Sequence, residues 1–267
     1  MSLMLKANGE IVVNCFSGRT DWRECRRFLE DRGYIDRFSK DRTSPSRAAT
    51  VTPPPAGPDP IKLARVKSLW EHSTPTLKTL AVRYLTQRGL AGTFETSSEL
   101  GYLDSCDHRP YGSKYPPFRF SPAMLAPIRD GEGAHVGLHI TYLDRKTGYR
   151  RTDDPSRKII GQMAGGAIQL HPIRDDTLLV AEGIETALSA GRRFDATAWS
   201  LVSAVNMASW QPPAGVKRLL IASDTNPVGR DAAFALAATA KEAGLKARVL
   251  ISPEGTSDWN DLDTRCG

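Results

Sequence analysis

The last third of the chain carries the clearest pattern of hydrophobic and polar positions. Four short apolar runs predict strands, at residues 178–181, 198–203, 218–222 and 248–251. Two stretches with apolar residues at helical spacing predict helices, and each ends before a glycine: 184–190 before Gly191, and 230–243 before Gly244. This succession predicts a compact α/β domain over residues 175–267, with right-handed crossovers and a mainly parallel four-stranded sheet.

The middle of the chain, residues 61–174, has a more mixed pattern. Helical spacing predicts helices over 61–70 and 74–89, the second capped by its first residue. Farther along, residues 137–143 and 149–151 flank a polar turn and are predicted to be paired strands. We therefore expect a mixed α+β subdomain here.

Residues 91–135 are rich in Pro and Gly and are expected to be irregular. Four aromatic residues stand there near basic ones: Tyr111, Tyr115, Phe118 and Phe120. Aromatic residues of this kind usually pack in a core, and this interpretation is favoured over base stacking beside phosphate contacts.

The first 60 residues divide into two parts. Residues 1–38 are predicted to be a small module, with a strand at 11–16 followed by one amphipathic helix. Residues 39–60 shift to Ser, Thr, Arg and Pro, with almost nothing to bury, and are predicted to be an extended linker.

Composition and charge narrow the class of protein. Lys and Arg outnumber Asp and Glu by 36 to 30 in 267 residues, so the formal charge is +6, which favours a polyanionic partner. No apolar run approaches the roughly 18–20 residues that span a bilayer, and a charge and a glycine interrupt the first ten residues too early for a secretory signal. The four cysteines are widely spaced and are expected to be reduced thiols. We expect a cytoplasmic protein without a membrane partner.

Acidic residues follow three of the four predicted strands. Glu182 comes directly after the first strand, Asp224 closely follows the third, and Asp258 and Asp261 lie after the fourth. Because the carboxyl ends of neighbouring parallel strands meet at one edge of a sheet, these side chains are expected to converge. Carboxylate oxygens are preferred ligands of Mg²⁺, so the sequence predicts a divalent cation between protein carboxylates and substrate phosphates.

The segments that carry these acids resemble the three signature segments of the Toprim domain. They are residues 182–188, 223–233 and 258–262. They are most similar to the Toprim primases of phages, plasmids and proteobacterial mobile elements, and residues 165–170 resemble the segment that leads into that domain. The resemblance is clear over 137–267 and looser before it. It implies a C-terminal Toprim sandwich preceded by a primase-like subdomain.

The resemblance also implies roles for individual residues. Glu182 matches a glutamate that acts as general acid/base and contacts metal, and Asp224 matches the first acid of an Asp-x-Asp metal site. Asn226 stands where the second aspartate is usual. It is expected to complete the first metal site with Asp224 by lending its side-chain carbonyl oxygen, although it removes one charge from the cluster. Asp258 and Asp261 match the last acidic pair, which supports a second ion. The implied cofactor is Mg²⁺ or Mn²⁺.

Purely structural roles are open for two acids of these segments. Asp224 is placed to cap the helix that follows it, and Glu185 is placed to be a solvated acid in the first turn of its helix. Glu182 has a weaker structural alternative, because it ends an apolar strand and has no basic neighbour in the sequence.

The densest basic segment lies directly before the acidic strands. Its predicted contacts with a template or a triphosphate are Arg145, Arg150, Arg151 and Lys158. Aspartates dilute this segment, and a solvated face is the alternative interpretation.

The N-terminal module resembles the second half of the zinc ribbon that precedes such primases. Cys15 is its one candidate ligand, and Arg19 stands where a second cysteine is expected. Structural zinc sites have four protein ligands, so the module is predicted to be a degenerate ribbon without zinc.

These features and the resemblance predict a metal-dependent DNA primase-type nucleotidyltransferase. It would synthesise short primers on a single-stranded DNA template from nucleoside triphosphates, and a replicative helicase in trans is compatible with this role. A Toprim nuclease would use the same ions to cleave nucleic acid. A catalytically impaired Toprim protein would instead bind DNA or a protein partner and act as an inhibitor or regulator.

Overall fold

The computed structural model describes residues 2–5, 11–14, 59–108, 119–153 and 155–264. The chain divides into two compact units, residues 1–54 and 55–267. In the first unit, β1 (Ser2–Leu5) pairs antiparallel with β2 (Ile11–Asn14), which agrees with the strand expected there. The expected helix of this unit, Cys15 and the linker up to residue 58 lie outside the described residues.

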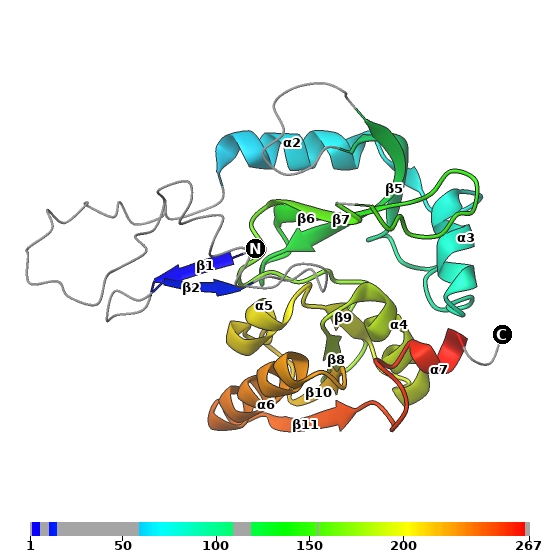
Figure 1. Cartoon of the computed structure of the whole chain (residues 1–267). Coiled ribbons are helices and arrows are strands. Elements are labelled where there is room, and N and C mark those ends of the chain that lie inside the picture. The colour runs from blue at the N-terminus through cyan, green and yellow to red at the C-terminus, as the bar shows by residue number, and fades with distance from the viewer. Residues whose placement is uncertain (1, 6–10, 15–58, 109–118, 154, 265–267) are drawn as a thin grey trace, which may run out of the picture. The chain divides into compact units, whose positions relative to one another are not determined.

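An antiparallel sheet forms the first half of the second unit (Figure 1). Its five strands, in spatial order, are β3 (Thr74–Pro75), β4 (Gly101–Asp107), β5 (Phe120–Arg129), β6 (His135–Tyr142) and β7 (Arg157–Gly161). The strand predicted over 137–143 is confirmed as β6. The expectation of irregular structure over residues 91–135 is wrong, because β4 and β5 form a pair of antiparallel strands there. β5 is hard to recognise because it contains two prolines and is buried on both faces, so it lacks the alternation of a half-exposed strand.

Two smaller expectations for this half are also corrected. Phe120 is 61% exposed and does not belong to the core, while the other three aromatic residues of its cluster lie outside the described part of the chain. The returning strand expected at 149–151 is reduced to an isolated bridge between Leu143 and Arg150. The apolar residues Ile159 and Ile160 of β7 take the place beside β6 instead.

Two helices accompany this sheet. α2 (Pro60–Glu71) is capped by Asp59, whose carboxylate accepts a hydrogen bond from the backbone N of Ile61 at 2.9 Å. It packs on β6 and β7 and buries Val66 (Figure 1). α3 (Leu80–Gln87) begins later than the predicted start at Thr74, because β3 pairs with β4 and Thr79 is the N-cap.

A four-stranded parallel sheet, in the order β11-β10-β8-β9, forms the second half of the unit and confirms the predicted α/β sandwich. Its elements along the chain are β8 (Thr177–Ala181), α4 (Ile184–Phe194), β9 (Ala198–Ser200), α5 (Ala204–Ser209), β10 (Arg218–Ser223), α6 (Pro227–Glu242), β11 (Lys246–Ile251) and α7 (Asp261–Thr264). The short helices α5 and α7 were not predicted. Gly191 lies inside α4 rather than at its end, and Asp195 ends that helix in a left-handed conformation with φ of 45°.

β8 and β9 and most of β10 are buried on both faces of the sheet, which explains their continuous apolar runs; the edge strand β11 is mostly exposed or half-buried. Leu179 and Ala181 of β8 face α4, whereas Leu178 and Val180 face α5 and α6. Alternate residues of a strand point to opposite faces, so a strand covered on both sides needs apolar residues throughout.

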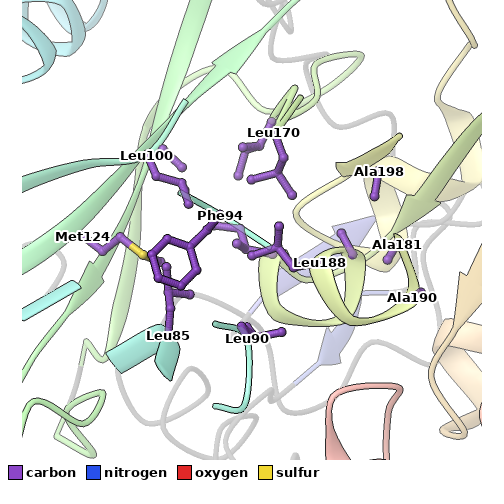
Figure 2. Close-up of a cluster of buried hydrophobic side chains, with 14 of the residues drawn as sticks. Leu85, Leu90, Phe94, Leu100, Met124, Leu170, Ala181, Leu188, Ala190 and Ala198 are labelled. Atoms are coloured by element: carbon purple, nitrogen blue, oxygen red, sulfur yellow. The ribbon is translucent and has the colours of Figure 1, made fainter. Parts of the chain in front are cut away.

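One hydrophobic cluster joins the two halves of the unit. In Figure 2, Phe94 and Leu85 meet Met124 of β5 on one side and approach Leu188 of α4 on the other. The boundary proposed at residues 174 and 175 therefore separates two sheets that share one core. Among the described residues, no helix is long and apolar enough to cross a membrane.

Candidate functional site

Glu182 lies at the carboxyl end of β8, where the chain turns into α4. Its backbone oxygen accepts a hydrogen bond from the Ser200 hydroxyl at 2.8 Å, which fixes the turn against β9. Gly183 is the N-cap of α4 and makes no side-chain hydrogen bond. Burial raises the pKa of the half-buried Glu182 carboxyl, although the Ala204 backbone N–H and the Arg157 charge oppose this rise.

Asp224 follows β10, but the N-cap of the next helix, α6, is Asn226 and not Asp224. Asn226 Oδ1 accepts a hydrogen bond from the backbone N of Gly229 at 2.8 Å. The capping role considered for Asp224 is therefore wrong. Asp224 Oδ1 is buried and has no hydrogen-bond partner among the described atoms. An unpaired buried carboxylate oxygen is unfavourable unless a proton or a cation compensates it.

Asp258 and Asp261 lie in a tight turn after β11. Asp258 Oδ1 accepts hydrogen bonds from the backbone N of Asn260 at 2.8 Å and of Asp261 at 3.0 Å. Asp261 Oδ2 accepts one from the backbone N of Ser257 at 2.6 Å. The backbone N of Thr225 donates to the oxygen of Ser257 at 3.0 Å, and this bond joins the turn to the loop that carries Asp224.

These four carboxylates line one cavity of about 390 Å³. Burial, followed by the charges of Glu182, Asp258 and Asp261, raises the pKa of Asp224 to about 7. Burial also raises the pKa of Asp258. The predicted convergence of acidic side chains at the edge of the parallel sheet is therefore present. The metal-ligand role expected for Asn226 is corrected: Asn226 does not line this cavity, because its Oδ1 caps the first turn of α6.

The donor set fits a hard divalent cation. Four carboxylates around one cavity, with one oxygen left unpaired, are the oxygen ligands that Mg²⁺ prefers. Within the described ranges, no three His, Cys, Asp or Glu side chains form a ready-made metal-binding group. Bound Mg²⁺ usually keeps several waters and takes only one or two carboxylates together with substrate phosphates, so such a group is not required.

Comparison with known proteins identifies this half of the unit. The family described as the Toprim domain matches residues 177–267, the segment that carries all four carboxylates. Residues 177–267 are a Toprim domain. A family described as a domain of unknown function matches residues 62–170, which include the antiparallel sheet. No curated protein matches the chain.

Several solved primase structures are similar to the chain. The crystal structure of the RNA polymerase domain of Mycobacterium tuberculosis primase DnaG is 18% identical, covers 78% of this chain and 80% of its own, and has a TM-score of 0.49. A DnaG primase catalytic domain bound to single-stranded DNA is 17% identical over 78% of each chain, with a TM-score of 0.48. A DNA primase domain from Pseudomonas aeruginosa is 18% identical over 75% of this chain and 74% of its own, with a TM-score of 0.47.

A polar network anchors the C-terminal end of the Toprim domain beside α3 and α4. The fully buried Asn260 donates from Nδ2 to the backbone oxygen of Arg88 at 2.8 Å and to Ser189 Oγ at 3.0 Å, and its Oδ1 accepts from Arg88 Nε. Asp263 is buried and pairs with Arg192 at 2.7 Å and with Arg193. Asn260 stands between Asp258 and Asp261, so this network holds the acidic turn in place.

The four predicted basic contacts lie at different places. Arg150 lines the cavity. Arg145 and Arg151 form ion pairs with Asp104 and Asp153, at 2.8 and 2.7 Å. Lys158 lies opposite Ile140 on the sheet face that packs against α2, and it does not line the cavity.

Other cavity residues were missed by sequence reasoning. Arg157, Arg88 and His139 line the cavity, and they come from β7, the end of α3 and β6. Glu185 also lines it and is buried rather than solvated, because it pairs with Arg157. Arg157 lies in the basic segment between Arg145 and Lys158, but the sequence prediction named its neighbour Lys158 instead. The face of β7 that meets the cavity is decided by pairing with β6, which the sequence pattern does not reveal.

Proposed function

We propose that the chain is a metal-dependent, primase-type nucleotidyltransferase that synthesises short primers on single-stranded DNA. The observation that carries the proposal is the single cavity in which Glu182, Asp224, Asp258 and Asp261 meet. The choice of primer synthesis rests on the resemblance of the three acidic segments and of residues 165–170 to Toprim primases.

Each carboxylate has a distinct place in this proposal. Asp224, Asp258 and Asp261 would hold Mg²⁺ or Mn²⁺, and the ion would favour the deprotonated 3′-hydroxyl and neutralise the triphosphate. Glu182 is the group proposed to accept the proton of that hydroxyl, because burial raises the pKa of its carboxyl and brings it closer to neutrality. Arg150 supplies a positive charge for phosphate in the same cavity.

Incubation of the full chain with single-stranded DNA, labelled nucleoside triphosphates and Mg²⁺ or Mn²⁺ tests the proposal. We expect product that grows with time, and its loss in Glu182→Gln with retained DNA binding. Asp231→Asn is a matched control, because Asp231 is exposed on α6 and does not line the cavity. A template that becomes shorter would indicate a Toprim nuclease. DNA binding without either product would indicate a non-catalytic Toprim protein.

A further inference from the structure

An ion pair between Arg157 and a buried carboxylate, Glu185, has no part in the proposed metal chemistry. Glu185, in the first turn of α4, is 5% exposed. Its Oε1 accepts hydrogen bonds from the Tyr84 hydroxyl of α3 and from Arg157 Nη2, which is 3.0 Å away. Burial alone would raise the pKa of Glu185, but the Arg157 charge and the Tyr84 hydrogen bond outweigh burial and lower it to about 2. This buried carboxylate therefore stays ionised.

Arg157 extends from the buried carboxylate to the cavity. Its side chain is 41% exposed, whereas that of Glu185 is 7% exposed. Arg157 lines the cavity together with Arg150. A guanidinium has five N–H donors, and the hydrogen bond from Nη2 to Glu185 uses one of them. Part of the Arg157 side chain is thus held in place while another part is open to a ligand in the cavity.

Stability alone explains this arrangement poorly. Glu185 must give up its contact with water to be buried, and this cost offsets much of what its pairing with Arg157 contributes to stability. A guanidinium with a fixed orientation is, in contrast, what bidentate recognition of a phosphate requires. Three elements that are distant in sequence, α3, β7 and α4, each supply one member of the group.

We propose that Arg157 binds phosphate oxygens of a nucleoside triphosphate in the cavity, and that Tyr84 and Glu185 are positioning residues for its guanidinium. This inference rests on the proposed function and names the side chain that receives its substrate.

Calorimetric binding of ATP with Mg²⁺ to the full chain, without template, tests the inference. Arg157→Gln should weaken binding by about tenfold to a hundredfold, the range expected when charged hydrogen bonds are lost. Arg157→Lys keeps the charge but loses the planar fork, so it should remain severalfold weaker than the unchanged protein.

A double-mutant cycle separates positioning from a general structural role. Tyr84→Phe keeps the ring and removes the hydroxyl, and it should weaken ATP binding severalfold. In the Arg157→Gln background the same change should have no further effect, because Tyr84 acts through Arg157. Equal weakening in both backgrounds would overturn the positioning role.

Arg129 provides the matched control. It pairs with Glu99 at 2.6 Å, both side chains are mostly buried, and Arg129 does not line the cavity. Arg129→Gln should lower the melting temperature and leave the affinity for ATP unchanged. If Arg157→Gln binds ATP as tightly as the unchanged protein, the inference is wrong and the proposed function stands. If the unchanged protein binds no ATP, the proposed function itself fails.

Discussion

Replacing Asp224 with an asparagine removes the charge that the acidic cavity disfavours most. In the absence of a cation, burial and then the charges of Glu182, Asp258 and Asp261 raise the pKa of Asp224 from 3.8 to about 7. The folded protein therefore holds a proton, between about pH 4 and 7, that the unfolded chain has already released. The tighter binding of this proton stabilises the folded state at low pH, and that stabilisation is lost as the pH rises through 7.

The size of the effect follows from the rise in pKa. A rise from 3.8 to about 7 corresponds to about 4 kcal/mol if the site were fully shielded from solvent. Asp224 is only half-buried, so solvent screening reduces the expected penalty to about 1–2 kcal/mol. The amide that replaces the carboxylate has no charge to desolvate. We therefore expect Asp224→Asn to be the more stable protein at about pH 8, with a melting temperature higher by about 3–6 °C.

Thermal and urea unfolding with a chelator present, at about pH 5 and about pH 8, checks this expectation. The gain should be smaller at pH 5, where most of the folded protein already carries a proton on Asp224. Asp231→Asn, an exposed change on α6, should show no such dependence on pH. Mg²⁺ should stabilise the unchanged protein and have little effect on Asp224→Asn. A gain of equal size at both pH values, or a loss of stability at pH 8, would refute the reasoning.

Three further substitutions probe the surroundings of the carboxylates. Asn226→Asp should keep the cap on α6, since Asp caps as well as Asn, and should change stability by only a few tenths of a kcal/mol. Because residue 226 does not line the cavity, the stabilisation by Mg²⁺ in a melting titration should stay nearly unchanged. Gly89→Ala should destabilise the protein more than Gly92→Ala, as measured by urea unfolding. Both glycines have a positive φ, so both changes strain the backbone. A Cβ at Gly89 would also lie 2.7 Å from the Asp263 backbone oxygen, whereas Gly92 faces open space. Asn260→Ala should lower the free energy of unfolding by about 1–3 kcal/mol, because its buried partners lose their hydrogen bonds. The same change should weaken Mg²⁺ binding. Unchanged Mg²⁺ binding would show that the network does not hold the acidic turn.

The parts of the fold that could be predicted from sequence are those governed by local pattern. β8 and β9 and most of β10 are buried on both faces, so most of their residues are apolar, whereas only Leu250 of the edge strand β11 is buried. Glu182 and Asp224 could be placed at one edge because each follows such a run, and the parallel pairing of β8 with β10 brings them together. Here a simple rule about strand ends was enough.

The parts that were missed depend on contacts between distant residues. β5 is buried because one of its faces packs with α2 and the other shares a hydrophobic cluster with α4. Its two prolines argue against a strand in the sequence. The group of Tyr84, Arg157 and Glu185 joins positions up to 101 residues apart. No spacing or composition in the sequence links these three residues, so tertiary structure was needed to find them.

Asn226 shows how such structure changes the meaning of a residue. In sequence, it is a missing metal-binding charge and an argument for an impaired protein. In the structure, its side chain is used by the first turn of α6, and the four carboxylates that line the cavity include none from this position. Mg²⁺ bound with substrate phosphates usually takes only one or two carboxylates. The loss of one candidate ligand is therefore compatible with a working metal site, and Asn226 alone is not an argument against catalysis.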